Sequence, residues 1–313
     1  MSTASAPYES ILETIGATPV VRLSRILEPG SAAVHLKLEQ LNPCGSMKDR
    51  TARAILEQAE AQGRLKPGGT VVEATSGNFG IGLALVCAVK GYKLVLAMPE
   101  SMSLERRALL RSYGVRLELT PAQLHLEGAM ARARALAAEI PDAFVPSQFE
   151  NEANARAHED STAQELLASA EADGVRIDAF VMGFGSGGAL TGIGRALRAR
   201  IPEIQILAVE PAGSEVLSGK PAGPHRIQGL GPGFVPPLLD RSLVDRSLAV
   251  SDRDAWAMKD RLAKEEGLLV GLSTGAHVHA AAQVARELGP GHAVYTLACD
   301  TGERYFSMAE HFR

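Results

Sequence analysis

A reactive lysine stands in the stretch NPCGSMKDR, residues 42–50. Pro43 and Gly45 mark a turn, and a helical pattern begins directly after them, so Lys48 is expected in the first turn of a helix. The partial positive charge at a helix N-terminus disfavours a second cation and therefore favours the neutral amine of a lysine. A neutral lysine is the nucleophile that forms Schiff bases with carbonyl groups. For a lysine considered alone, a solvated surface residue is the default interpretation.

A second motif, GFGSGGALT at residues 183–191, follows an apolar run and opens a helical pattern. Backbone N–H groups of such a loop surround a phosphate at the helix N-terminus. Gly183, Gly185 and Gly188 also satisfy Gly-x-Gly-x-x-Gly, and Glu210 ends the next expected strand. That pairing is typical of a dinucleotide site. An NAD-dependent oxidoreductase, another phosphorylated cofactor and simple tight packing all remain open on this stretch.

Two further loops carry hydroxyl and amide groups. TSGNFG, residues 75–80, lies between an expected strand and a helix, where its free N–H groups would suit a carboxylate. The alternative is an ordinary N-cap formed by Ser76 or Asn78. Thr301, in CDTGERY at residues 299–305, follows the last expected strand. Open α/β sheets bind ligands at that end of their strands, although a capping role is the simpler interpretation of one threonine.

GLSTG at residues 271–275 raises a different enzyme class. It matches the Gly-x-Ser-x-Gly nucleophile elbow of hydrolases, and Asp300 and His311 follow Ser273 in the order of a catalytic triad. The pattern is short and glycines are frequent in this chain, so a structural turn is the preferred interpretation of Ser273.

The elements that must position these loops alternate between short apolar runs and longer helical patterns, which predicts the α/β class with a parallel sheet covered by helices on both faces. Strands are expected at 33–38, 70–73, 93–98, 116–119, 179–182, 205–209, 243–250 and 293–297. Helices are expected at 49–62, 80–90, 104–112, 128–139, 154–169, 190–200, 252–265 and 277–287.

Composition narrows the class of protein. With 313 residues, 46% of them hydrophobic, the chain is long enough to bury a large core. A net charge of −4 offers no basic excess for nucleic acid or an anionic membrane, so small-molecule substrates are expected. The N-terminus shows no targeting pattern, which predicts a cytoplasmic protein. Three cysteines far apart argue against disulfides and a structural zinc site, and no metal is expected.

Pro141 and Pro146 suggest a crossing between two lobes near residue 147. We expect residues 41–147 to form one smaller lobe, and residues 1–40 with 148–313 to form the other. The Gly- and Pro-rich stretch 218–237 is expected to be a long ordered loop, and loops of that length are usually functional when ordered.

Taken together, the motifs closely resemble the cysteine synthase family, which comprises O-acetylserine sulfhydrylases and relatives of cystathionine β-synthase. The resemblance rests on NPCGSMKDR (42–50), EATSGNFGIGLA (73–84), MPESMSLERR (98–107), GSGGALTG (185–192), EPAGSEVLSG (210–219), PHRIQGLGPGF (224–234) and DTGERY (300–305). It implies a two-lobed, tryptophan-synthase-β-like architecture, fold-type II of the pyridoxal 5'-phosphate (PLP) enzymes. Residues 41–147 would bind substrate and the larger lobe the PLP phosphate. A homodimer, and docking of a serine acetyltransferase tail, are further implications.

The resemblance also implies residue roles. Lys48 would hold PLP as a Schiff base and act as the catalytic base, Asn78 would bond the phenolic oxygen, and Thr301 would face the pyridine nitrogen. The phosphate would be held by Gly185, Ser186, Gly187, Gly188 and Thr191. The substrate would be bound by Thr75, Ser76, Gly77, Asn78, Phe79 and Gln148, with Gly229 closing over the site.

The implied reaction is β-replacement on an O-activated L-serine. O-acetylserine and sulfide would give L-cysteine and acetate through an aminoacrylate intermediate. The sequence departs from the family at Phe79, where a threonine is usual, and that hydroxyl would contact the substrate carboxylate. Phe79 therefore leaves open a specialised enzyme that uses O-phosphoserine as donor, or a nucleophile other than sulfide, to form diaminopropionate or cystathionine. A competing interpretation is that its ring packs into the helix behind the loop.

Overall fold

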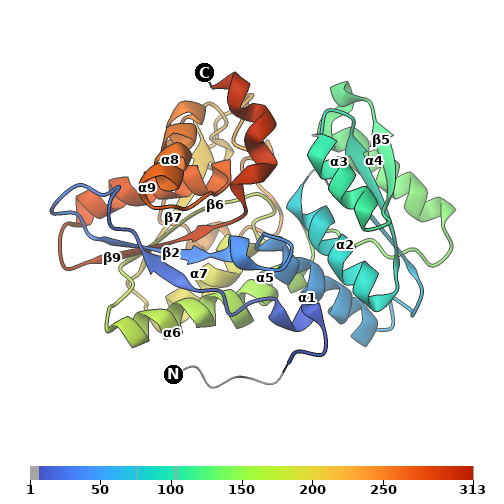
Figure 1. Cartoon of the computed structure of the whole chain (residues 1–313), viewed down its shortest axis with the longest axis horizontal. Helices are drawn as coiled ribbons and strands as arrows, with labels where there is room; N and C mark the ends of the chain where they lie inside the picture. The colour runs from blue at the N-terminus through green and yellow to red at the C-terminus, as the bar shows by residue number, and fades with distance from the viewer. Residues whose placement is uncertain (1–6, 76, 103, 313) are drawn as a thin grey trace.

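The computed structural model describes residues 7–312 except 76 and 103. Within that part of the chain, strands form a six-stranded sheet in the order β1-β2-β9-β6-β7-β8 and a three-stranded sheet, β3-β4-β5 (Figure 1). The strands are β1 Val20–Arg22, β2 Ala33–Leu38, β3 Thr70–Ala74, β4 Lys93–Pro99, β5 Arg116–Thr120, β6 Ala179–Gly183, β7 Gln205–Pro211, β8 Arg246–Val250 and β9 Ala293–Ala298. All neighbouring strands are parallel except β1 and β2. The α/β class and the two-lobed architecture are confirmed.

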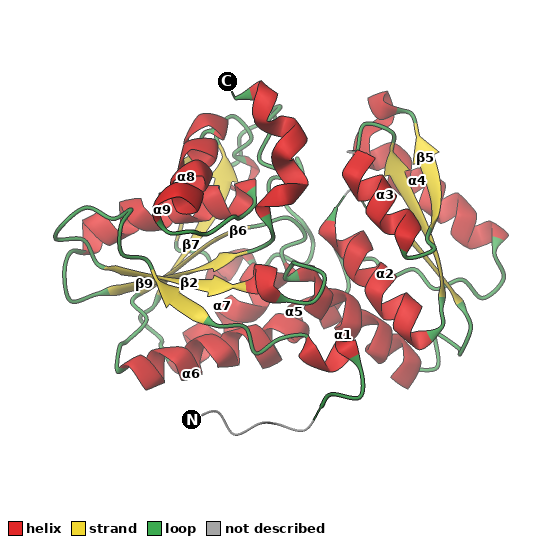
Figure 2. Cartoon of the chain, in the orientation of Figure 1, coloured by secondary structure: helices red, strands yellow, loops and turns green. Residues whose placement is uncertain are grey.

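Helices cover both faces of the larger sheet (Figure 2). The α-helices are α1 Lys48–Ala61, α2 Asn78–Lys90, α3 Leu104–Ser112, α4 His125–Glu139, α5 Glu152–Ala157, α6 Ala163–Asp173, α7 Gly188–Arg200, α8 Asp252–Glu265 and α9 Leu272–Leu288. Val181 and Leu207 pack with α8 and α9 on one face, whereas Phe180 and Ile206 pack with α6 and α7 on the other. Successive strand residues point to opposite faces, so strands buried on both faces read as continuous apolar runs.

The smaller sheet follows the same rule. Val71 and Leu96 pack against α1 and α2, while Val72 and Val95 pack against α4. Helix α1 also packs against α5 of the larger body, so Lys48, at its first position, lies where the two sheets meet. The expected lobe boundaries at residues 41 and 147 stay a prediction.

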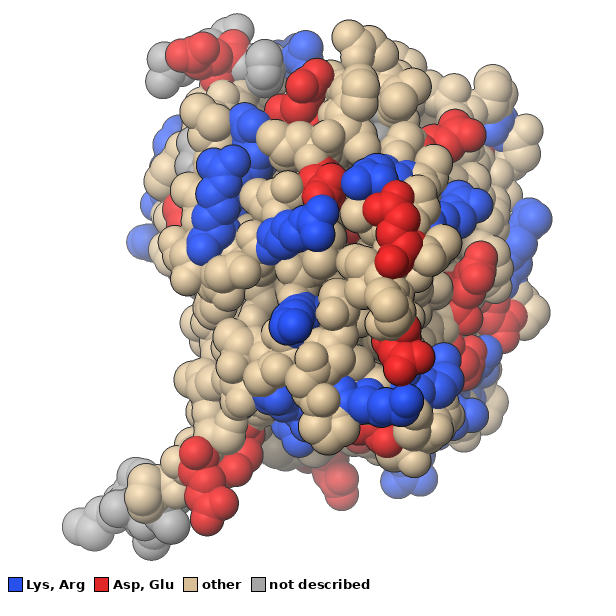
Figure 3. Space-filling model, turned by 90° about the vertical axis from the view of Figure 1, so that its right-hand side faces the viewer, with Lys and Arg blue, Asp and Glu red and all other residues tan. Residues whose placement is uncertain are grey.

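The surface over the smaller sheet carries both signs of charge, and Lys or Arg side chains alternate with Asp or Glu (Figure 3). Glu118 on β5, for example, pairs with Arg116 and with Arg132 of α4. No helix among the described residues is both long and apolar enough to cross a membrane.

Three elements differ from the sequence-based expectation. Strand β1 was not predicted, because it has three residues, none of them fully buried, and therefore no apolar pattern. The expected helix over 154–169 is three segments, since a π-helical turn at His158–Thr162 separates α5 from α6. The last expected strand before α8 begins at Arg246, because residues 241–243 form a 3-10 turn. Residues 219–240 contain no helix or strand, as expected for the long loop.

Candidate active site

One pocket lies at the carboxyl end of β6, where the start of α1, the start of α2, the glycine loop and the start of α9 converge. Lys48, Asn78, Gly185, Ser186, Gly187 and Gly229 line it, together with the neighbouring Ser273, Cys299 and Asp300. Residues more than 130 positions apart in the chain therefore meet here, since Lys48 and Ser186 are separated by 138 residues. The carboxyl ends of parallel strands are where α/β proteins bind ligands.

Lys48 is the first residue of α1, as predicted. Its Nζ reaches into the pocket and donates to Ser186 Oγ at 3.3 Å. Burial lowers the pKa of Lys48 from that of an ordinary lysine to about 8, because the charged amine loses its hydration. About a tenth of Lys48 is therefore the neutral, nucleophilic amine at pH 7, far more than of an ordinary lysine, and burial is the main cause.

The glycine loop cannot accept side chains. Gly187 has φ +86°, and a Cβ there would lie 2.9 Å from the Leu239 backbone. A Cβ on Gly185 would lie 2.7 Å from the carbonyl oxygen of Gly229. Helix α7 begins at Gly188, directly after Gly187. No side chain of these glycines therefore covers the backbone N–H groups at the start of the helix. This arrangement fits a phosphate bound by N–H groups at a helix start.

Thr191 lies behind this loop, outside the pocket. Its hydroxyl donates to Leu238 O at 2.9 Å and accepts from Asp240 N at 2.9 Å, and the residue is fully buried. The only hydroxyl hydrogen is thus used by the protein itself. The structure does not support the prediction that Thr191 binds phosphate. Its role is to attach α7 to the loop that precedes Asp240.

Asn78 starts α2 and is clamped on both sides. Its Nδ2 donates to Asp300 Oδ2 at 2.6 Å, and its Oδ1 accepts from Arg304 Nη1 at 2.5 Å. Tyr305 donates its hydroxyl to the same Asp300 oxygen at 2.5 Å. Because an amide nitrogen has two hydrogens, this clamp leaves one Nδ2 hydrogen for a ligand in the pocket.

Of the remaining residues predicted to bind substrate, Gly229 lines the pocket, whereas Thr75 and Gln148 do not. Thr75 is buried, and its Oγ1 accepts from Gly77 N at 3.3 Å, which shapes the turn before α2. Ser76 lies outside the described residues. Gln148 is buried and follows Ser147, whose φ of +53° bends the chain sharply, but Gln148 does not line the pocket. Gly229 lines the pocket with φ +97°.

Phe79 points away from the pocket. Its side chain is 2% exposed and belongs to the hydrophobic cluster between α1, α2 and the smaller sheet. The packing interpretation of Phe79 is therefore the one that the geometry supports.

Thr301 lines a separate cavity of about 570 Å³, together with Gly45 and Arg304. At the start of α9, the hydroxyl that lines the main pocket belongs to Ser273, which lies in the first turn of that helix beside the Cys299 thiol. The structure therefore places Thr301 apart from the site that was predicted for it. The signal for Ser273 was present in GLSTG, but that motif suggested a different enzyme class.

The two rival constellations are not assembled. Asp300 accepts from Asn78 and Tyr305, and the side chain of His311 lies outside the described part, so the described residues do not assemble the triad predicted for Ser273. Glu210 is buried, and its Oε1 accepts from Leu217 N at 2.8 Å, which stabilises its own loop. Because Glu210 is 1% exposed, its carboxylate is not presented to a dinucleotide ribose.

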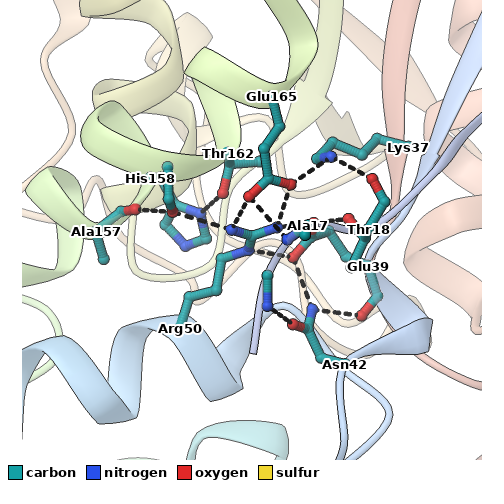
Figure 4. A network of polar contacts seen from close by, with 12 residues as sticks. Ala17, Thr18, Lys37, Glu39, Asn42, Arg50, Ala157, His158, Thr162 and Glu165 are labelled. Carbon is teal, nitrogen blue, oxygen red and sulfur yellow. Dashed lines mark hydrogen bonds and ion pairs between the residues drawn. The ribbon is translucent and has the colours of Figure 1, made fainter. Parts of the chain in front are cut away.

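Sequence reasoning missed a buried ionic network behind Lys48 (Figure 4). Arg50 donates to both oxygens of Glu39 and both oxygens of Glu165, at 2.7 to 2.8 Å. Lys37 pairs with Glu165 at 2.7 Å and donates to Thr18 O at 2.8 Å. The network ties the first turn of α1 to β2 and α6. It therefore fixes the direction from which Lys48 enters the pocket.

The fold and the pocket define a class, namely enzymes with a lysine and a phosphate loop between two parallel-sheet lobes. Residues 11–300 match the family model described as pyridoxal-phosphate dependent enzyme. The chain belongs to this family, and the cysteine synthase resemblance is confirmed.

Among its relatives, a cysteine synthase of Staphylococcus aureus is 50% identical over 304 residues, which cover 97% of each chain. The crystal structure of O-ureido-L-serine synthase has TM-score 0.93 and 44% identity and covers 96% of this chain and 94% of that one. Cysteine synthase from Entamoeba histolytica has TM-score 0.91 and 38% identity, with 98% and 93% covered. The protein is therefore a PLP-dependent enzyme of cysteine synthase type, and the dinucleotide and hydrolase interpretations are wrong.

Proposed function

We propose that the protein catalyses β-replacement on an O-activated L-serine, with O-acetyl-L-serine and sulfide giving L-cysteine and acetate. The observation that carries the proposal is that Lys48, Asn78 and the glycine loop line one pocket in a chain that is 50% identical to a cysteine synthase. When bound, PLP supplies an electron sink for the substrate α-carbon, and the protein selects which bond breaks.

The phosphate would be held by the backbone N–H groups of Gly185, Gly187 and Gly188 and by the Ser186 hydroxyl. The loop geometry supports this, because no Cβ fits at these glycines and α7 begins there. A helix N-terminus and its free N–H groups favour an anion without any cationic side chain.

Lys48 would attach the cofactor and then serve as the base that takes the substrate α-proton onto Nζ. Its pKa of about 8 suits both tasks, because a base is most effective when its pKa lies near the working pH. Asn78 would donate its remaining Nδ2 hydrogen to the cofactor's phenolic oxygen, since Asp300 holds the amide nitrogen and Arg304 holds the amide oxygen in place.

We assign to Ser273, in place of Thr301, the role of facing the pyridine nitrogen, because Ser273 lines the pocket away from the glycine loop and Thr301 does not line it. A neutral hydroxyl does not keep that nitrogen protonated as a carboxylate would. The substrate carboxylate would be bound at the start of α2 by Thr75, Ser76 and Gly77, with Gln148 beside them and Gly229 closing the site. In this arrangement Phe79 contributes packing alone.

A second candidate differs only in the nucleophile. The similarity to O-ureido-L-serine synthase, at TM-score 0.93, favours an oxygen nucleophile such as hydroxyurea. A smaller lobe of residues 41–147 and a larger lobe of residues 1–40 and 148–313 remain proposals that rest on the family resemblance. A homodimer and docking of a serine acetyltransferase tail are proposals on the same ground.

The test is a product analysis with paired substrates. The PLP-loaded enzyme would be given O-acetyl-L-serine or O-phospho-L-serine with sulfide, homocysteine, ammonia or hydroxyurea, and products would be identified by mass spectrometry. We expect cysteine from O-acetylserine and sulfide to have the highest kcat/KM. A higher kcat/KM for any other pair would reject the cysteine synthase assignment and identify the specialised reaction.

A further inference from the structure

Asn154 of α5 is a fully buried residue that touches three parts of the site. Its Oδ1 accepts from Thr51 Oγ1 on α1 at 3.0 Å. Its Nδ2 donates to Gln148 O at 2.8 Å and to Ser186 Oγ at 2.9 Å. Both amide hydrogens are therefore committed, one to the Gln148 backbone and one to the phosphate loop.

This arrangement constrains the Ser186 hydroxyl. Ser186 Oγ accepts from Asn154 Nδ2 and also from Lys48 Nζ at 3.3 Å. A hydroxyl has two lone pairs and one hydrogen, and Asn154 Nδ2 occupies one lone pair whether or not Lys48 is attached to the cofactor. The hydrogen must then point away from Asn154. Because Ser186 lines the pocket, that direction is available to a bound phosphate.

The amide oxygen of Asn154 is connected through hydrogen bonds to the π-helical turn. His158 Nε2 lies 3.3 Å from Thr51 Oγ1, and His158 Nδ1 lies 2.9 Å from Thr162 Oγ1. Thr51, His158 and Thr162 are all fully buried. Burial lowers the pKa of His158 well below that of an ordinary histidine, so its ring is neutral, with one N–H donor and one acceptor nitrogen.

These contacts are consistent with a single direction of donation. Thr162 donates to His158 Nδ1, His158 Nε2–H donates to Thr51, Thr51 donates to Asn154, and Asn154 donates to Ser186. We assign the histidine tautomer from this pattern, because Asn154 Oδ1 accepts from Thr51 and Thr51 has only one hydrogen to give. Hydrogen bonds that run head to tail polarise one another, which strengthens the last donor.

We propose that Asn154 is a positioning residue that turns the Ser186 hydroxyl into a dedicated hydrogen-bond donor to the cofactor phosphate. Through its bonds to Thr51 and the Gln148 carbonyl, it also holds the phosphate loop in register with α1 and the substrate segment. Packing supports a fixed position, because a Cβ on Gly188 would collide with the Asn154 amide. The proposal rests on PLP binding at the glycine loop, and it is independent of donor and nucleophile.

The test compares an isosteric substitution of Asn154 with a truncation of it. Asn154→Asp keeps the shape but has no N–H to donate, so the Ser186 hydroxyl would donate to the new carboxylate instead of the phosphate. Asn154→Ala removes the N–H donor that orients the Ser186 hydroxyl, but the hydroxyl can still donate to the phosphate. If Asn154 served only packing, the isosteric Asp variant would be the milder of the two.

The readout is the ratio of the affinities of the PLP-free full-length protein for pyridoxal phosphate and for pyridoxal. General damage weakens both ligands, whereas a misdirected donor weakens only the phosphate compound. Losing a hydrogen bond to a charged group corresponds to about 10- to 150-fold in affinity, so Asn154→Asp should lower the ratio by that factor. Asn154→Ala should lower it less than about tenfold.

Two controls complete the design. Asp178→Ala removes the hydrogen bond that Ala293 N donates at the amino ends of β6 and β9, opposite to the pocket, so it should lower thermal stability and leave the ratio unchanged. In a Ser186→Ala background, Asn154→Asp should lose most of its effect on the ratio, because residue 186 then has no hydroxyl for residue 154 to orient. A full effect in that background would mean that carboxylate repulsion acts directly, and an unchanged ratio in Asn154→Asp itself would mean that Asn154 has no role at the phosphate. Either result would overturn the proposal.

Discussion

Replacing Phe79 by threonine, the residue usual at this position in similar enzymes, separates packing from substrate recognition. The Phe79 ring is 2% exposed and lies in the cluster between α1, α2 and the smaller sheet. Truncating a buried phenylalanine costs about 3–5 kcal/mol, because the transfer free energy is lost and a cavity remains. Threonine fills part of that space but buries a hydroxyl, so we expect a loss within this range.

The loss can be read as a melting temperature. At about 2.1 cal/mol/K per residue, unfolding a chain of 313 residues has an entropy of about 0.66 kcal/mol/K, so the substitution should lower Tm by about 5–8 °C. Differential scanning calorimetry of Phe79→Thr and of Phe306→Ala makes the comparison. Phe306 is 61% exposed, and its truncation should change stability by less than about 0.5 kcal/mol.

Kinetics with the same variant provide the second half of the test. Because Phe79 does not line the pocket, the preference among O-acetylserine, O-phosphoserine and the nucleophiles should not change. A Phe79→Thr protein with unaltered Tm and a shifted donor or nucleophile preference would refute the packing assignment. That result would show that the side chain at position 79 takes part in substrate recognition.

Three other predictions follow from the site. The second-order rate constant for PLP binding to the PLP-free protein, followed by visible absorbance, should rise with pH through about 8 and then level off, because only the neutral Lys48 amine attacks. A rate constant that does not depend on pH would contradict the assignment of Lys48 as the residue that attaches PLP. Burial alone would raise the pKa of Glu165, but hydrogen bonds from Arg50 and Lys37 hold it at about 2. This pairing therefore stabilises the fold above pH 4.5, and the stabilisation is lost as pH falls towards 2. The loss of unfolding free energy in Glu165→Gln, about 3–5 kcal/mol at pH 7, should therefore shrink across that window, and so should the accompanying drop in Tm. Ser273→Ala should lower kcat/KM by up to about tenfold while Thr301→Ala leaves it unchanged, and the reverse order would restore Thr301 to the pyridine nitrogen.

The sequence predicted the elements whose signals are local. Strands such as β6 are buried along their whole length, so a continuous apolar run reports them directly. The three-residue edge strand β1 and the π-helical turn at His158–Thr162 have no such signal, because one is too short for a pattern and the other changes the hydrogen-bond register within a helical sequence.

The same division holds within the site. Lys48, Asn78 and the glycine loop stand at strand-to-helix turns whose chemistry is readable from neighbouring residues. Ser273 and Thr301 both carry hydroxyls at such turns, and only tertiary packing decides which one faces the pocket. The pairing of Arg50 with Glu165 spans 115 residues, so no local pattern could reveal it.

The central claim is that Lys48 takes the α-proton from the substrate and that the nucleophile adds to the β-carbon only afterwards. Cysteine formed from O-acetyl-L-serine and sulfide in D2O tests it most directly, because the hydrogens of Nζ exchange with solvent. Mass spectrometry and NMR should find deuterium at the α-carbon of the product, and Lys48→Ala should form no cysteine above the background without enzyme. Cysteine that retains the original α-hydrogen of its substrate would mean direct displacement at the β-carbon, and it would contradict the role of Lys48.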